Sequence, residues 1–147
     1  MGDISFVLAG VSSKDEYALR AILDLAQQRP GLPIRIAKIA ERQKIPQKFL
    51  EQILSELKRG GFVESHRGAD GGYRLSRSPD AITIGEVLRY VKGDSRHSKE
   101  LEGDHPFAAL WSQVDAKISD FIDKTTFGEL VRNWQEQQSR NLPSWDI

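Results

Sequence analysis

Apolar residues recur every three or four positions in six stretches of the chain, which is the spacing of helices that bury one face. The first stretch predicts a helix from Lys14 to about Gln28, which ends in a proline- and glycine-rich loop that starts at Pro30. Five further helices are expected over residues 36–43, 46–59, 84–92 and 107–123, and from residue 126 onward. The pattern therefore predicts a mainly helical chain.

Residues that start and stop helices support these boundaries. The tetrapeptides that begin at Ser13, Thr83 and Thr126 read Ser/Thr-x-x-Glu, a capping box in which hydroxyl and glutamate each accept a backbone amide. Pro46 opens the third helix, and Gly60-Gly61 ends it. The apolar stripe of this third helix, which we expect to face the core, consists of Phe49, Leu50, Ile53, Leu54 and Leu57.

The hydrophobic period changes after this helix. Phe62–His66 and Tyr73–Ser76 are short strand-like runs, and the glycine-rich residues 67–72 between them permit the positive φ angles of a hairpin turn. Two short helices, a tight turn and a hairpin are the order of a winged helix-turn-helix. In that fold the second helix enters a major groove of DNA and the hairpin reaches the backbone or the minor groove.

Charge is distributed unevenly, although 21 basic and 21 acidic residues cancel. Residues 1–79 hold 13 of the basic and nine of the acidic residues, a net charge of +4, and residues 80–147 carry −4. The zero total hides a basic half, whose Lys and Arg side chains can neutralise phosphates, and an acidic half. No nucleophile–base constellation is present, so an enzyme is not expected.

Several segments together resemble one protein family. They are Tyr17-Ala18-Leu19-Arg20-Ala21-Ile22-Leu23-Asp24-Leu25-Ala26, Ile39-Ala40-Glu41, Ile45-Pro46-Gln47-Lys48-Phe49-Leu50-Glu51-Gln52-Ile53-Leu54, Arg67-Gly68-Ala69-Asp70-Gly71-Gly72-Tyr73-Arg74-Leu75 and Ile82-Thr83-Ile84-Gly85-Glu86-Val87. From about Ser12 to Trp134 the chain resembles the Rrf-type family of bacterial winged helix-turn-helix transcription regulators, the family of IscR, NsrR and CymR. The resemblance implies a homodimer that binds a palindromic promoter site in double-stranded DNA, with repression as the expected effect.

The resemblance also implies which residues contact DNA. The matching positions on the recognition helix and in the wing are Gln47, Lys48, Glu51, Gln52 and Arg67. Glutamine can read adenine, lysine can reach guanine or phosphate, glutamate can accept from cytosine, and arginine beside glycine suits a narrow minor groove. Two further basic candidates are Lys14 and Arg59, although a Lys58-Arg59 pair is equally typical of a solvated helix end.

The chain departs from the family pattern because it has no cysteine. Many family members hold an iron–sulfur cluster with three cysteines in the loop before the long helix. The matching loop, residues 94–106, offers only His97 and His105 among acidic residues. A thiolate-ligated cluster is therefore excluded and no cofactor is expected. Two histidines eight residues apart match no usual ligand spacing, so we expect a solvated loop rather than a metal site.

The predicted organisation is a winged helix-turn-helix DNA-binding domain over residues 12–93, a flexible loop over 94–106, dimerisation helices over 107–138, and tails over 1–11 and 139–147. The fold class is mainly α with a small β-hairpin wing and a long C-terminal dimerisation helix. That helix is expected to cross its symmetry mate. Its expected interface residues are Phe107, Leu110, Trp111, Val114, Ile118, Phe121 and Ile122.

The sequence also supports expectations about the location of the protein and its regulation. The apolar run over residues 4–11 is too short to span a bilayer and lacks a basic leader, so no membrane association and a cytoplasmic location are expected. A small-molecule or protein effector is expected near the 94–106 loop or the dimer cleft. The alternative hypothesis is a winged-helix module that binds another protein and has no DNA-binding role, which the basic half disfavours.

Overall fold

The computed structural model describes residues 10–93 and 105–141 of the chain, and these fold around a helical core. The elements in order are α2 (Ser13–Ala26), α3 (Ile36–Gln43), α4 (Gln47–Arg59), β1 (Val63–His66), β2 (Gly72–Leu75), the 3₁₀ turn η1 (Pro79–Ala81), α5 (Ile84–Lys92), α6 (Pro106–Lys124) and α7 (Phe127–Arg140). The predicted class, mainly α with a two-stranded wing, is confirmed.

Helix α2 starts one residue earlier than the capping pattern predicts. Ser12, not Ser13, is the N-cap: its hydroxyl accepts from the Asp15 amide at 3.2 Å, and the Asp15 carboxylate accepts from the Ser12 amide at 3.0 Å. The same carboxylate lies 2.7 Å from Nζ of Lys92, which anchors Asp15 in the core and favours this register. The capping box at Thr83 forms as predicted. At Thr126 only one of its two hydrogen bonds forms, in which the Thr126 hydroxyl accepts from the amide of Glu129 at 3.0 Å.

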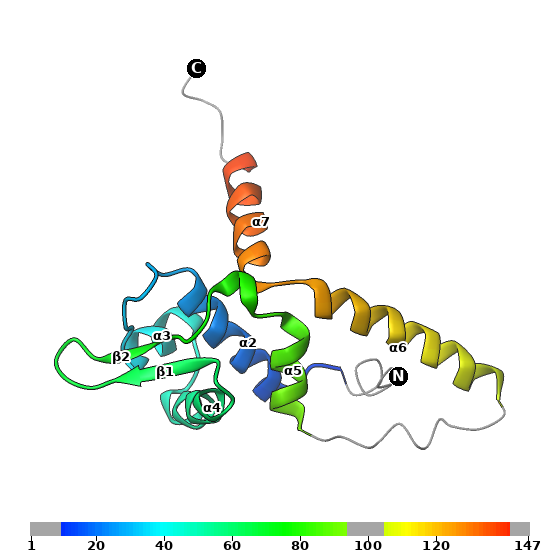
Figure 1. Cartoon of the computed structure of the whole chain (residues 1–147), viewed down its shortest axis with the longest axis horizontal. Helices are drawn as coiled ribbons and strands as arrows, with labels where there is room; N and C mark the ends of the chain where they lie inside the picture. The colour runs from blue at the N-terminus through cyan, green and yellow to red at the C-terminus, as the bar shows by residue number, and fades with distance from the viewer. Residues whose placement is uncertain (1–9, 94–104, 142–147) are drawn as a thin grey trace.

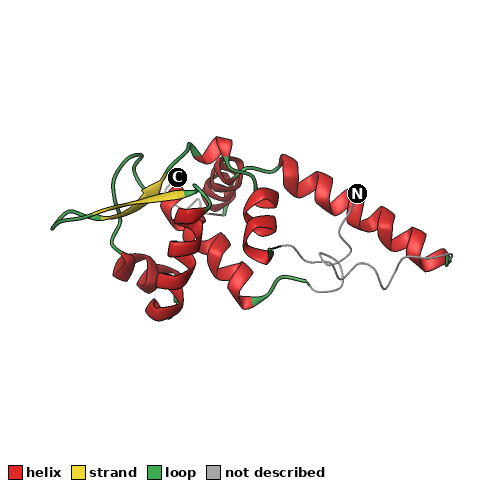
Figure 2. Ribbon diagram, turned by 60° about the horizontal axis from the view of Figure 1, so that its bottom comes forward, coloured by secondary structure: helices red, strands yellow, loops and turns green. Residues whose placement is uncertain are grey.

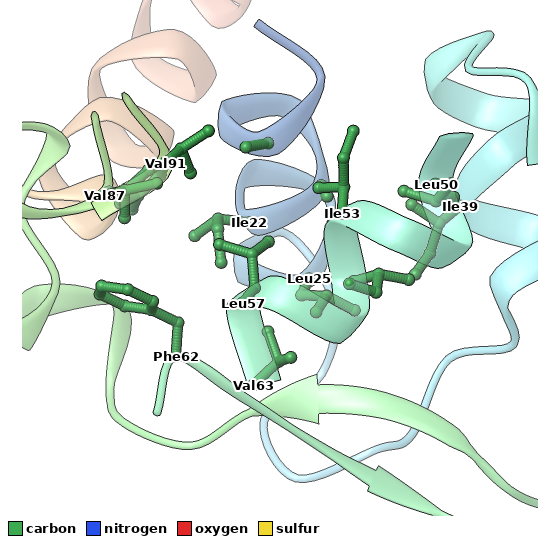
Figure 3. Packing of buried hydrophobic residues seen from close by; sticks show 14 of the residues in the cluster. Ile22, Leu25, Ile39, Leu50, Ile53, Leu57, Phe62, Val63, Val87 and Val91 are labelled. Atoms are coloured by element: carbon green, nitrogen blue, oxygen red, sulfur yellow. The ribbon is translucent and has the colours of Figure 1, made fainter. Parts of the chain in front are cut away.

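The core surrounds α2, which contacts α3, α4, α5, α7 and β2. Figure 3 shows Ile22 and Leu25 of α2 facing Ile53 and Leu57 of α4, with Val87 on the α5 side. All five side chains are buried because the apolar faces of the surrounding helices converge on α2. The recognition-helix candidate α4 is thus held by its apolar face, and its polar face is left exposed.

The segment between the two C-terminal helices hydrogen-bonds to the backbone at the start of α5. The amide of Ile84 donates to the Thr125 carbonyl at 2.9 Å, and the amide of Phe127 donates to the Ile82 carbonyl at 3.0 Å. From there α6 extends away from the body on the side opposite the hairpin, and α7 leaves in a third direction (Figures 1 and 2). In α6 only Asp115 is buried.

Candidate nucleic-acid interface

The turn between α3 and α4 gives the pair its geometry. Lys44 ends α3 in the left-handed conformation, with φ of 55°, and the amide of Ile45 donates to the Ala40 carbonyl at 3.0 Å. Pro46 is the N-cap of α4, not part of its first turn as predicted, and no side chain caps that end. The amides of the first turn therefore point outward without a side-chain partner, where they can meet a phosphate.

The predicted base-reading residues share the exposed side of α4. The side chains at the start of this helix that face away from the core are Gln47, Lys48, Glu51 and Gln52. Leu50 and Leu54 lie on the opposite side and are fully buried. The first turn holds no acidic residue, so the positive end of the helix dipole adds to the charge of Lys48.

The wing is a regular antiparallel hairpin in which Val63 pairs with Leu75 and His66 with Gly72. Its turn, from Arg67 to Gly71, carries the predicted Arg67 as an exposed residue directly after β1. Gly68 and Gly72 have φ of 103° and 148°, which other residues rarely adopt, so glycine is required at both positions. The turn is fastened to the domain because the guanidinium of Arg35 donates to the Ala69 carbonyl.

The two further basic candidates are engaged within the chain. Nζ of Lys14 lies 3.1 Å from Oε1 of Glu56 on α4, so a phosphate would have to compete with this carboxylate. Arg59 donates to the Ser55 hydroxyl at 3.1 Å, an exposed contact that leaves most of its N–H groups available. The neighbouring Lys58 donates to the Ser65 hydroxyl of β1 at 2.7 Å, which joins the recognition helix to the wing.

Phe49 is a surface residue, and its assignment to the core stripe is wrong. Its side chain is 58% exposed in the first turn of α4, and its ring centroid lies 6.5 Å from that of Tyr17. At about 100° per residue, Phe49 lies about 90° from the centre of the buried face, which consists of Leu50, Ile53, Leu54 and Leu57. That angle was a signal available in the sequence, and the aromatic character of the residue obscured it.

A charged cluster on the hairpin was also missed. Arg74 on β2 donates to Oε1 of Glu64 on β1, with Nη2 at 3.1 Å, and His66 Nε2 lies 3.2 Å from the same oxygen. The hydrogen bond from Arg74 lowers the pKa of Glu64, and His66 lowers it further, so the carboxylate stays ionised. The cross-strand pair fixes the two strands next to Arg67.

None of the predicted interface residues of α6 is buried by the residues that the structure describes. Phe107, Leu110 and Phe121 are exposed, the last to 70%, and the other four predicted residues are half-buried. At the C-terminal end of this set, Phe121 and Ile122 line an apolar groove of about 330 Å³ together with Leu19, Leu23 and Leu130. Among the described residues, α6 thus presents an apolar face that another surface could cover.

The chain provides no thiolate for an iron–sulfur cluster, because it contains no cysteine. Within residues 10–93 and 105–141, no three His, Cys, Asp or Glu side chains gather into a possible metal site. His105 caps α6, with Nδ1 accepting from the Phe107 amide at 3.1 Å. His97 and most of the 94–106 loop lie outside the described residues. The residues present do not fit the family's cluster.

In the part of the chain that the structure describes, no helix is long and apolar enough to cross a bilayer. An exposed polar recognition helix, a brace helix and an arginine-bearing wing place the chain in the class of winged helix-turn-helix proteins.

Comparison with known proteins narrows this class to one family. Residues 11–133 match the Rrf2 family model, described as an iron-dependent transcriptional regulator, and the chain belongs to this family. It is 38% identical to the HTH-type transcriptional regulator IscR of Aliivibrio salmonicida over 135 residues, 87% of this chain and 80% of that protein. It is 34% identical to the regulator CymR of Bacillus subtilis over 122 residues, 82% of this chain and 88% of that protein.

A solved structure agrees with these sequence relatives. IscR of T. potens matches with a TM-score of 0.77 at 32% identity, over 89% of this chain and 93% of that one. The relatives are transcriptional regulators and not enzymes, in agreement with the sequence prediction. The chain is therefore a DNA-binding transcription regulator of the winged-helix type.

Proposed function

We propose that the protein is a homodimeric repressor that binds a palindromic promoter site in the bacterial cytoplasm without an iron–sulfur cluster. The observation that carries the DNA-reading part is the shared exposed face of Gln47, Lys48, Glu51 and Gln52, with Arg67 at the wing beside it. The apolar face of α6 supports the homodimer, because a second copy of the helix could cover it. A twofold dimer carries two recognition helices, which matches the two half-sites of a palindromic promoter site.

Each proposed contact has a distinct role. Lys48 reaches guanine or phosphate from the first turn of α4, and Glu51 accepts from cytosine in the same groove. Arg67 enters the adjacent minor groove, whose negative potential is greatest where the groove is narrow. Arg67 is fixed in position because the hairpin is held on both sides, by Arg35 at its turn and by Lys58 along β1.

Binding of promoter DNA by the full chain tests this proposal. In a titration with DNA from its own promoter region at moderate salt, we expect Lys48→Ala and Arg67→Ala each to weaken binding about 10-fold or more. Arg140→Ala removes an equal charge from an exposed side chain at the end of α7 and serves as the control, with unchanged affinity. Lys48→Ala should reduce the salt slope by about one if Lys48 meets a phosphate.

The alternative, a winged-helix module for a protein partner, predicts a different result. It requires that the wild-type chain lack salt-dependent affinity for any duplex. Unchanged affinity in both variants, with the wild type binding normally, would show that DNA is read elsewhere on the surface.

A further inference from the structure

A pocket on the far side of the hairpin from α4 has the chemistry of an anion site. It has a volume of about 280 Å³ and lies between the α2–α3 connection and the segment after β2. Three leucines and two prolines form its apolar walls, and Arg29, Arg74 and Arg77 supply charge. None of the described residues that line it is acidic. Arg74 and Arg77 have carboxylate partners outside the lining, Glu64 and Glu86, whereas Arg29 has none among the described residues. The lining therefore presents N–H donors and a net positive charge, which favours a negatively charged occupant.

Two of these arginines are held in place by contacts with neighbouring residues of the chain. Arg74 donates from Nη1 to the Gly31 carbonyl at 3.1 Å and pairs with Glu64, which joins the two sides of the pocket. The guanidinium of Arg77 lies 5.2 Å from the ring centroid of Phe62. An arginine carries five N–H donors, so each keeps donors for a ligand in a preset orientation.

Arg77 has two further contacts, and one of them is an ion pair. Its Nη1 donates to the Ala81 carbonyl at 3.2 Å, and its Nη2 lies 3.2 Å from Oε1 of Glu86. Arg29 is exposed, and its guanidinium forms no hydrogen bond or ion pair with any residue that the structure describes. Arg29 therefore gives the pocket a surplus of positive charge that a ligand can neutralise.

We propose that this pocket binds a small organic anion, carrying carboxylate or phosphate groups on a short carbon skeleton, that acts as an effector. Its volume lies near the lower end for ligand pockets, which suits a metabolite-sized molecule. Its apolar walls match a carbon skeleton, and its arginines match the acidic groups. This places an effector away from the 94–106 loop and the dimer cleft, where the sequence analysis expected one.

The position of the pocket connects it to the wing. Figure 1 shows β1 between β2 and α4, so the pocket beside β2 does not share the recognition surface of α4. Arg74 lies in β2, and its pairing partner Glu64 is the facing residue of β1. A ligand that draws Arg74 toward the pocket weakens this cross-strand pair and changes the position of Arg67. This coupling to DNA affinity rests on the proposed function, whereas anion binding does not.

Anion binding is tested on the free protein, without DNA. Citrate and glycerol 3-phosphate represent the two sources of negative charge, and each is titrated by calorimetry against sodium chloride of equal ionic strength. We expect saturable binding of at least one probe with a Kd in the millimolar range or tighter. Arg29→Gln should weaken it about 10-fold, and Ser76→Asp, which puts a carboxylate at an exposed lining position, should abolish it. Arg140→Gln, a matched loss of charge at the end of α7, should bind like the wild type.

Three results would overturn the proposal. These are no saturable binding of either probe beyond chloride, equal weakening in Arg29→Gln and Arg140→Gln, and wild-type binding by Ser76→Asp. Promoter DNA is titrated separately, with no probe present. A loss of DNA affinity in Arg29→Gln under those conditions would make Arg29 a phosphate contact for DNA instead. Loss of the proposed DNA function would leave the calorimetric result unaffected, so the two failures can be told apart.

Discussion

Arg42 on α3 donates two parallel hydrogen bonds to the carboxylate of Asp24 on α2, from Nε to Oδ1 at 3.0 Å and from Nη2 to Oδ2 at 2.9 Å. Asp24 is 1% exposed, and Nε2 of Gln43 donates to it as well, at 3.1 Å. Donation of these hydrogen bonds to Asp24 raises the pKa of Arg42. The pair sets the angle of the brace helix α3 and therefore the placement of α4.

Arg42→Ala should destabilise the fold by about 3 kcal/mol, because it leaves the buried Asp24 carboxylate without its main partner. Unfolding in urea measures this change. Arg132→Ala, which breaks an exposed pair with Asp80 at 2.8 Å, is the control and should change the free energy of unfolding by less than about 1 kcal/mol. Equal effects of the two substitutions would contradict a structural role for the buried pair.

Phe49→Ala and Leu50→Ala should distinguish an exposed position of α4 from its core face. Leu50 is fully buried, so its truncation should cost about 2–5 kcal/mol of stability. Phe49 is exposed, so its truncation should change stability by less than about 1 kcal/mol. Thermal unfolding compares the two proteins, and a large loss of stability in Phe49→Ala would place its ring in the core after all.

Low pH should weaken the ion pair between Asp15 at the start of α2 and Lys92 at the end of α5. Burial alone raises the pKa of Asp15, but hydrogen bonds from Lys92 and Ser12 outweigh burial and lower it below its ordinary 3.8. A lowered carboxyl pKa stabilises the fold above the ordinary value, and this contribution is lost as the pH falls through the lowered one.

Asp15→Asn should therefore be less stable than the wild type at pH 7, by about 2–3 kcal/mol, with the gap closing below about pH 4. The free energy of unfolding, measured from pH 7 down to pH 3, tests this. A gap that stays constant over that range would show that the Asp15 charge does not contribute.

Phe121→Asp should convert the proposed dimer to monomers. The side chain is 70% exposed in the single chain, so the substitution leaves the fold of each subunit intact while placing a charge in the apolar interface. Light scattering gives the molecular mass. Ala116→Asp is the control, since Ala116 is exposed about 180° around α6 from the apolar face. A dimer that survives Phe121→Asp would assign dimerisation to another surface.

Much of the fold followed from local sequence signals. The Thr83 capping box and the helix it starts, Ile84–Lys92, depend on contacts between residues a few positions apart, and they formed as predicted. The glycine-rich wing turn is local in the same sense, because Gly68 and Gly72 adopt backbone angles that glycine alone accepts readily. The resemblance then supplied the candidate DNA contacts on α4 and at Arg67, which the structure shows as exposed.

Contacts between distant residues were decided by the tertiary structure. Ser12 rather than Ser13 caps α2 because Asp15 also meets Lys92, 77 positions away. The sequence analysis made Lys14 a candidate DNA contact, but in the fold its ammonium group forms an ion pair with Glu56. The local sequence allowed either serine to cap α2 and left Lys14 without a partner. In each case an ion pair between distant residues decided the outcome.

The sequence by itself determined the class of this protein: the order of helices and hairpin, the basic first half, and the absence of any cysteine for a cluster. The tertiary structure alone decided that Arg29, Arg74 and Arg77 line one pocket and that the described residues leave the apolar side chains of α6 exposed or half-buried. The physical reason is that periodicity, capping and turn chemistry act over a few residues. The meeting of side chains some 40 positions apart depends on how the helices converge on α2.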